Sequence, residues 1–382
     1  MTHKPSRRAF LSKTTKLLFA PAVLSGSFPM FAWSNDTYST RAIDLMKQAT
    51  VIDMLGLLTL NFPLMEKWSA HPESFTAADF EKYKSSGINI FHIAVGTGGP
   101  DVWNETRDFV GGWNTFLAGN DQYFMRIDSA GDLDRVKSSG KIGILIGVQN
   151  SEHFRTTEDV TRFYGWGQRV SQLTYNTRNM IGNGSTERRD EGLSDFGVAI
   201  VQKMNEVGMI VDVSHCGDKT SLDAFEVSKK PVLVTHSNAR ALNPGHPRCK
   251  PDEVIKKVGE TGSVMGITGV RMFVKGAEPT TLEDALNHFD YVAKMIGIEH
   301  VGVGSDIDLD GYDDMPPELN KQLRAGYKGS YGFREKIDID TIAHPKRMFD
   351  ITEGLIKRGY SNDQILGVLG GNFKRVMKVI MG

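Results

Sequence analysis

The chain has 382 residues, a formal net charge of −1, and is 40% hydrophobic and 24% charged. These values are typical of a soluble globular protein, and they exclude a collagen-like, an intrinsically disordered and a polytopic membrane protein. The near-neutral chain lacks the excess of positive charge that nucleic-acid-binding proteins use to contact phosphates, so we expect no nucleic-acid partner.

The first 34 residues are expected to be an export signal rather than part of the globule. They contain five basic residues and no acidic one, and an apolar stretch runs over residues 17–33. Residues 6–11 read Ser-Arg-Arg-Ala-Phe-Leu, which is similar to the twin-arginine signal Ser-Arg-Arg-x-Phe-Leu. The sequence therefore predicts a periplasmic protein that crosses the membrane by the twin-arginine pathway. Removal of residues 1–34 would leave one domain, residues 35–382, with a formal charge of −6 and no stable membrane span.

Short apolar runs of strand length recur along the mature chain, and helix-like stretches separate them. The eight runs are residues 51–57, 88–95, 142–149, 170–176, 209–215, 232–236, 263–270 and 301–306. Three intervening stretches, residues 193–208, 282–297 and 346–359, have apolar residues at helical spacing and end at a glycine. Eight strand–helix units in series predict an α/β fold in which a parallel sheet closes into a (β/α)8 TIM barrel. The alternative is an open doubly wound sheet, but no Gly-x-Gly-x-x-Gly follows the first run.

In such a barrel, the chemistry lies at the carboxyl ends of the strands. His215, His236 and Asp306 each end one of the predicted runs. Imidazole suits zinc, and a carboxylate can accept a proton from water that a cation activates. These positions predict the site of a metal-dependent hydrolase. We interpret His92, which lies inside an apolar run, as a buried core histidine.

Several motifs together resemble those of the membrane (renal-type) dipeptidase family, an amidohydrolase-like group. Residues 211–215 resemble the family's Asp-Leu-Ser-His, residues 231–237 its Pro-x-x-x-Ser-His-Ser, and residues 301–306 its Gly-Ser-Asp string. Residues 358–361 and 370–375 resemble its Arg-Gly-Tyr-Ser and Gly-Gly-Asn-Phe-x-Arg. The similarity runs from about residue 48 to 380. It implies a barrel hydrolase that acts on dipeptides with two zinc ions bridged by a Glu.

The resemblance also implies roles for four residues that match the family pattern. His215 and His236 correspond to the two histidine ligands of one zinc ion. Arg248 corresponds to the arginine that binds the substrate carboxylate, and Asp306 to the aspartate near the scissile bond. Asp306 is therefore the predicted catalytic residue.

Four other positions depart from the family pattern. Leu55 and Leu57 stand where the family has the His and Asp ligands of the other zinc ion, and Gln149 stands in place of the bridging Glu. Tyr175 replaces a substrate-contacting His, so we expect Tyr175 to contact the substrate as well. Leucine has no lone pair for a metal, and a neutral amide oxygen is a poor bridge between two cations.

The departures predict one zinc site at most, formed by His215, His236 and, weakly, Gln149, or no zinc at all. Glu152, His153 and Cys216 lie close by in the sequence and are candidates for a replacement ligand. Cys216 and Cys249 each follow a predicted site residue, so they either form a disulfide at the barrel mouth or are buried thiols.

The sequence thus predicts a periplasmic dipeptidase-like metallohydrolase whose partner is a small peptide, either a dipeptide or another small peptidic amide. One alternative is a dipeptidase-like enzyme repurposed for oxidative maturation of a peptide siderophore of the pyoverdine type. Another is a non-catalytic barrel that binds peptides. Whether the protein forms a homodimer stays open.

Overall fold

The computed structural model describes residues 38–312 and 315–382, so the predicted export signal lies outside the described residues. Residues Ser39–Gly382 form one compact unit. Within the described ranges, none of the helices is long and apolar enough to cross a membrane.

Eight parallel strands form the predicted barrel. They are β1 (Ile52–Asp53), β2 (Ile90–Val95), β4 (Ile142–Val148), β5 (Gln168–Gln172), β6 (Ile210–Asp212), β7 (Val234–Ser237), β8 (Met265–Ile267) and β9 (Val301–Val303). Pairing runs β1-β2-β4-β5-β6 and β7-β8-β9. A bridge between Asp212 and Leu233 joins the two groups. The bond from the Met54 amide to the Val303 carbonyl (2.9 Å) closes the ring between β9 and β1. The predicted (β/α)8 architecture is confirmed.

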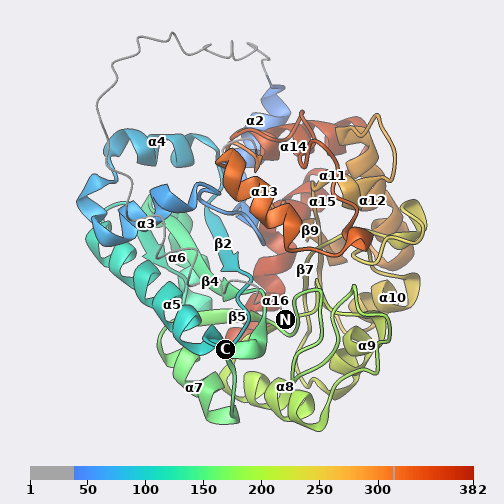
Figure 1. Ribbon diagram of the computed structural model, residues 1–382. Helices are drawn as coiled ribbons and strands as arrows, with labels where there is room; N and C mark the ends of the chain where they lie inside the picture. Colours follow the sequence, from blue (N-terminus) through green and yellow to red (C-terminus); the bar gives the residue numbers. More distant parts are fainter. Residues whose placement is uncertain (1–37, 313–314) are drawn as a thin grey trace. The chain divides into compact units, whose positions relative to one another are not determined.

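Fifteen α-helices lie in the described residues, and Figure 1 shows many of them around the outside of the strands. They are α2 (Thr40–Gln48), α3 (Phe62–Ala70), α4 (Ala77–Ser85), α5 (Val102–Gly119), α6 (Ala130–Ser139), α7 (Thr157–Gly165), α8 (Asp195–Val207), α9 (Asp218–Val227), α10 (Asp252–Glu260), α11 (Arg271–Val274), α12 (Leu282–Ile296), α13 (Pro317–Ala325), α14 (Arg347–Lys357), α15 (Asn362–Leu366) and α16 (Asn372–Met381).

The three helices predicted from the sequence, α8, α12 and α14, are present. Local chemistry fixes the ends of α8: the Ser194 side chain accepts a hydrogen bond from the Gly197 amide at its start, and Gly208 adopts a left-handed conformation (φ 84°) at its end. One strand, β3 (Phe124–Arg126), was not predicted; it pairs with β4 outside the closed ring.

Side chains along the strands alternate between two cores. On β2, Ile90 belongs to the cluster inside the barrel, whereas Phe91 and Ile93 pack in the larger cluster between the strands and the helices. This period of two is that of a β-strand, in which successive side chains point to opposite faces. The barrel interior is therefore a packed core, and polar side chains gather beyond it, at the carboxyl ends of the strands.

Candidate active site

Two imidazoles meet at the carboxyl ends of β6 and β7. The Nε2 atoms of His215 and His236 lie 3.1 Å apart, and both side chains are buried. Their ring centroids are 5.1 Å apart. The structure thus brings together the two histidines that the sequence assigns to one metal ion.

Hydrogen bonds to Nδ1 determine which nitrogen of each ring carries the proton. Nδ1 of His215 lies 2.8 Å from Oδ1 of Asn176, which can only accept. Nδ1 of His236 lies 2.8 Å from the Thr235 hydroxyl, and that hydroxyl donates its own proton to Asp212 (2.7 Å). Both Nδ1 atoms are therefore donors, and the two Nε2 lone pairs face each other. Two facing acceptors repel each other unless a cation lies between them.

The charge state of the pair follows from its surroundings. Burial, and after it the positive charge of Arg248, holds the pKa of His215 and of His236 well below the usual range. Both imidazoles are therefore neutral near pH 7, which is the form that binds a metal.

Arg248 is fully buried beside the two histidines. Its Nη2 donates to the His236 carbonyl (2.9 Å), and its Nη1 donates to the Ser214 carbonyl. The Phe273 ring lies 5.2 Å from the guanidinium. The Nε–H group is buried and has no hydrogen-bond partner among the described residues. An unpaired buried donor is costly, so this N–H is left to bond a group from outside the described residues.

Asp306 follows β9 in a left-handed conformation (φ 62°), and its amide donates to the Leu55 carbonyl (2.7 Å). Burial raises the pKa of Asp306 to about 7; Arg248 opposes this shift, and the charges of Asp53 and Asp338 add to it. A carboxyl group with such a pKa can both accept and release a proton near neutral pH.

A fully buried ion pair supports the turn that carries Asp306. The Asp53 carboxylate accepts hydrogen bonds from the Ser305 amide (2.8 Å) and hydroxyl (2.6 Å). Arg347, at the start of α14, lies 3.0 Å from the same carboxylate, and neither charged side chain is exposed.

Tyr175, in the loop after β5, covers one side of the imidazole pair. Its ring stacks on His215 with centroids 4.2 Å apart and an interplanar angle of 23°. Its hydroxyl lies 2.6 Å from that of Tyr327, which follows α13. Sequence reasoning missed Tyr327, since it matches no motif and lies 152 residues away.

Among the positions that the family resemblance assigns to two metal ions, the two imidazoles keep lone pairs that a metal could use, whereas the two leucines have none. Leu55 and Leu57 have hydrocarbon side chains without a lone pair, so neither offers a ligand to a second ion, and Leu55 is completely buried. No cluster of three or more His, Cys, Asp or Glu side chains that could hold a metal occurs within residues 38–312 and 315–382. The two imidazole nitrogens, 3.1 Å apart, are close enough for one ion to contact both.

Gln149 is the remaining candidate ligand. Its Oε1 is buried and has no partner in the described part of the chain, while its Nε2 donates weakly to the Ala94 carbonyl (3.4 Å). The Gln172 side chain links Gln149 to His215: it donates to the Gln149 carbonyl (2.5 Å) and accepts from the His215 amide (3.3 Å).

The suggested replacement ligands point elsewhere. Both ring nitrogens of His153 are engaged, one with the Asn150 carbonyl and one with Gln168 Oε1, each at 3.1 Å. Glu152 accepts from the Asn150 side chain (3.1 Å). Cys216 is packed in the outer core. None of the three joins the imidazole pair in a metal-binding group.

The two cysteines are free thiols, so the structure has no disulfide between them. Cys216 and Cys249 pack in separate hydrophobic clusters, and burial raises the pKa of Cys216 to about 11 and of Cys249 to about 12. The alternative of buried thiols therefore holds. His92 is buried as predicted, and its Nδ1 bonds to the Met54 carbonyl (2.7 Å).

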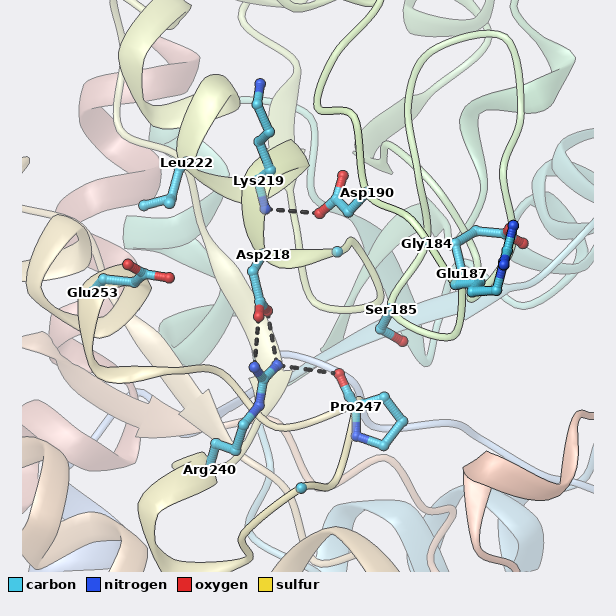
Figure 2. A pocket seen from close by; sticks show the side chains of 13 residues that line it. Gly184, Ser185, Glu187, Asp190, Asp218, Lys219, Leu222, Arg240, Pro247 and Glu253 are labelled. Atoms are coloured by element: carbon cyan, nitrogen blue, oxygen red, sulfur yellow. Dashed lines mark hydrogen bonds and ion pairs between the residues drawn. The ribbon is translucent and has the colours of Figure 1, made fainter.

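An open hollow of about 460 Å³ lies beside the imidazole pair rather than over it. Figure 2 shows the Asp218 carboxylate paired with the Arg240 guanidinium, and the Lys219 amide bonded to Asp190. Ser185 lines this hollow and donates its amide to the His215 carbonyl (2.8 Å). Neither His215 nor His236 lines the hollow.

Fold and site together define a barrel of the metal-dependent hydrolase type. A sequence model described as "Membrane dipeptidase (Peptidase family M19)" matches residues 39–325. The chain therefore belongs to the membrane dipeptidase family, as the motifs indicate.

Individual relatives agree with this assignment. An uncharacterised dipeptidase of Schizosaccharomyces pombe is 32% identical over 260 residues, which is 66% of this chain and 56% of that protein. The dipeptidase aclJ of Aspergillus oryzae is 33% identical over 245 residues, 63% of this chain and 52% of that protein. The chain thus matches about half the length of these curated relatives.

A solved structure is similar over nearly the whole barrel. The crystal structure of an amidohydrolase from Pseudomonas aeruginosa has 29% identity and a TM-score of 0.77, covering 89% of this chain and 99% of that one.

Proposed function

We propose that this protein is a dipeptidase-like metallohydrolase that acts on a dipeptide or another small peptidic amide with a single metal ion. His215 and His236 would hold the ion, which we take to be zinc, with the Gln149 side-chain oxygen as a weaker third ligand. The observation that carries the proposal is the pair of Nε2 lone pairs facing each other across 3.1 Å, each fixed by a bond at Nδ1. Membership of the dipeptidase family supports it.

When bound, the ion would polarise an amide carbonyl and make a water molecule more acidic. Asp306, with a pKa of about 7, takes the proton from water and returns it to the leaving amine. The unpaired Nε–H of Arg248 holds the substrate carboxylate and fixes the orientation of the amide. The Tyr175 phenol, whose pKa burial raises well above its usual value, stays protonated and donates a hydrogen bond to the substrate.

Hydrolysis of a dipeptide panel, with and without added zinc, tests the proposal. We expect zinc-dependent release of free amino acids, and we expect His215→Ala to reduce the rate by at least about 100-fold, as for loss of a metal ligand. His71→Ala is the matched control, because that histidine is exposed and pairs only with Glu73. Turnover that survives His215→Ala would overturn the proposal that this histidine holds the metal ion. No zinc-dependent turnover of any dipeptide would overturn the proposed activity and favour a non-catalytic peptide-binding barrel.

We further propose that the protein works in the periplasm after export by the twin-arginine pathway. The support is the Ser-Arg-Arg-Ala-Phe-Leu string at residues 6–11. A reporter fused to residues 1–34 should be exported, and Arg7→Lys combined with Arg8→Lys should abolish that export. Export that survives the double substitution would contradict the pathway.

A further inference from the structure

Residues 326–333, which follow α13 (orange in Figure 1), contact two loops at the mouth of the barrel. We call these eight residues the cap segment. The Tyr327 hydroxyl lies 2.6 Å from the Tyr175 hydroxyl, and Lys328 Nζ lies 3.0 Å from a carboxylate oxygen of Glu187. The Tyr331 carbonyl accepts from His246 Nε2 (3.2 Å). The segment is thus attached to the loops that follow β5 and β7.

Aromatic rings connect the cap segment to both ends of the candidate active site. Tyr175, which touches Tyr327, stacks on His215. On the other side, the rings of Tyr327 and Tyr331 lie 4.5 Å apart, and those of Tyr331 and Phe273 lie 5.3 Å apart. Phe273 in turn contacts the Arg248 guanidinium. The cap segment therefore spans the space between the imidazole pair and the predicted carboxylate-binding arginine.

The polar contacts between the cap segment and the loop after β5 are partly exposed to solvent. The side chains of Lys328 and Glu187 remain 47% and 24% exposed, and solvent-exposed ion pairs contribute little to stability. The Tyr175 and Tyr327 hydroxyls share one neutral hydrogen bond, and their rings lie 6.1 Å apart. Tyr331 is buried in a cluster with Phe273 and Val270. Substrate entry would require the segment to leave these contacts, which is a loop motion of the kind that opens many active sites.

We propose that the cap segment closes over the active site and that Tyr327 determines which substrates the site accepts. This inference rests on the proposed dipeptidase function. The Phe273 ring contacts Arg248, and the rings of Tyr331 and Tyr327 follow it in a chain of contacts. The side chain nearest the substrate carboxylate would therefore pack among aromatic rings. The favoured substrate class is therefore a dipeptide with an aromatic residue at its carboxyl end. Tyr327 lies beyond residues 39–325, the part of the chain that the family pattern matches.

Kinetics with alanyl-phenylalanine and alanyl-alanine test the role of Tyr327. For Tyr327→Ala we expect kcat/KM to fall by about tenfold or more with alanyl-phenylalanine and by less than about threefold with alanyl-alanine. Tyr327→Phe should raise KM by about three- to tenfold, and Tyr175→Phe by at least as much, because it also removes the hydrogen bond to the substrate. The double variant should be no worse than Tyr175→Phe alone, since both substitutions remove the Tyr175–Tyr327 bond. Tyr360→Phe is the control, since it removes a comparable bond to Asp290 (2.7 Å) elsewhere in the barrel. Equal losses with both substrates, or additive effects of the two Phe substitutions, would overturn the inference.

Hydrogen exchange of the full chain without substrate tests closure independently of activity. Lys328→Ala and Tyr327→Phe should each speed amide exchange across residues 326–333 by at least about threefold. Lys336→Ala is the matched control, because its ion pair with Asp340 (3.1 Å) lies outside the cap segment. If the wild type hydrolyses no dipeptide, the proposed function fails while the exchange data still decide closure. If amide exchange across residues 326–333 is unchanged in both variants, the inference that this segment closes over the site is wrong.

Discussion

The two sides of the barrel mouth have opposite chemistry. On the β6–β7 side, a polar network of Asn176, Thr235 and Asp212 orients two imidazoles. On the β1 side, Leu55 is packed without exposure where the family resemblance places a metal ligand. The barrel closes at β1 all the same. The comparison shows that the barrel fold does not need metal-binding side chains at β1, because apolar packing can take their place. On the β6–β7 side, the hydrogen bonds to the two imidazoles are enough to hold both Nε2 atoms toward each other.

The β1 side depends on its buried ion pair, which gives the largest expected effect on stability. Arg347→Met would leave the Asp53 carboxylate buried without its counter-charge, and loss of one partner of such a pair costs about 3–5 kcal/mol. Denaturant unfolding of the full chain measures this loss. Lys82→Met is the control, because its ion pair with Asp310 is exposed and should contribute less than about 1 kcal/mol. A decrease of less than about 1 kcal/mol in the free energy of unfolding of Arg347→Met would show that the Arg347–Asp53 pair does not stabilise the β1 side.

The β6–β7 side should instead respond in its metal affinity. Thr235→Val keeps the shape of the side chain but removes the hydroxyl that bonds Nδ1 of His236. Loss of such an outer partner typically weakens metal binding by about 10- to 100-fold. Leu55→Val, the matched change on the β1 side, should leave zinc affinity unchanged and destabilise the fold by about 1 kcal/mol. Zinc titration monitored by calorimetry measures the zinc affinity of the two variants. Equal affinities would mean that Thr235 does not orient His236.

Another buried histidine, His288, differs from the facing pair because both of its ring nitrogens have partners. His288 accepts from the Ala239 amide (3.1 Å) and donates to the Val274 carbonyl (2.9 Å), so both of its nitrogens are satisfied. Burial lowers its pKa from 6.5 to about 4. Between pH 6.5 and pH 4, His288 takes up a proton in the unfolded chain but not in the folded one. Its contribution to the free energy of unfolding is therefore intact above pH 6.5 and falls as the pH drops towards 4.

The expected slope from His288 is at most about 1.4 kcal/mol per pH unit. His288→Gln should reduce the dependence of unfolding free energy on pH between 6.5 and 4.5, and it should lower stability at pH 7. Chemical denaturation at a series of pH values checks this. A variant with the same pH slope as the wild type would exclude His288 as a contributor.

Much of the fold could be predicted because its signals are local. Most barrel strands lie in apolar runs that differ clearly from the amphipathic stretches between them, and glycines mark helix ends such as Gly208. Strand β5 is an exception, because four of its five residues are polar. Strand β3 could not be predicted, because a three-residue strand carries no periodic pattern. Likewise, the sequence placed His215 and His236 at neighbouring strand ends, where a barrel must bring them together.

The rest of the candidate site depends on contacts that sequence patterns do not encode. The Tyr175–Tyr327 bond joins residues 152 positions apart. The hydrogen bonds that set the tautomer of each imidazole come from Asn176 and Thr235, residue types that are common in any loop or strand. Conversely, Cys216 and Cys249 adjoin site residues in the sequence, yet they pack in separate clusters.

Metal stoichiometry is the most direct test of the central claim that one side of the mouth binds an ion and the other does not. The purified protein would be equilibrated with zinc, freed of excess ion and analysed by inductively coupled plasma mass spectrometry. We predict one zinc ion per chain in the wild type, one in Leu55→Val, and none in His215→Ala or His236→Ala. Two ions per chain, or a zinc ion that persists in both histidine variants, would contradict the account.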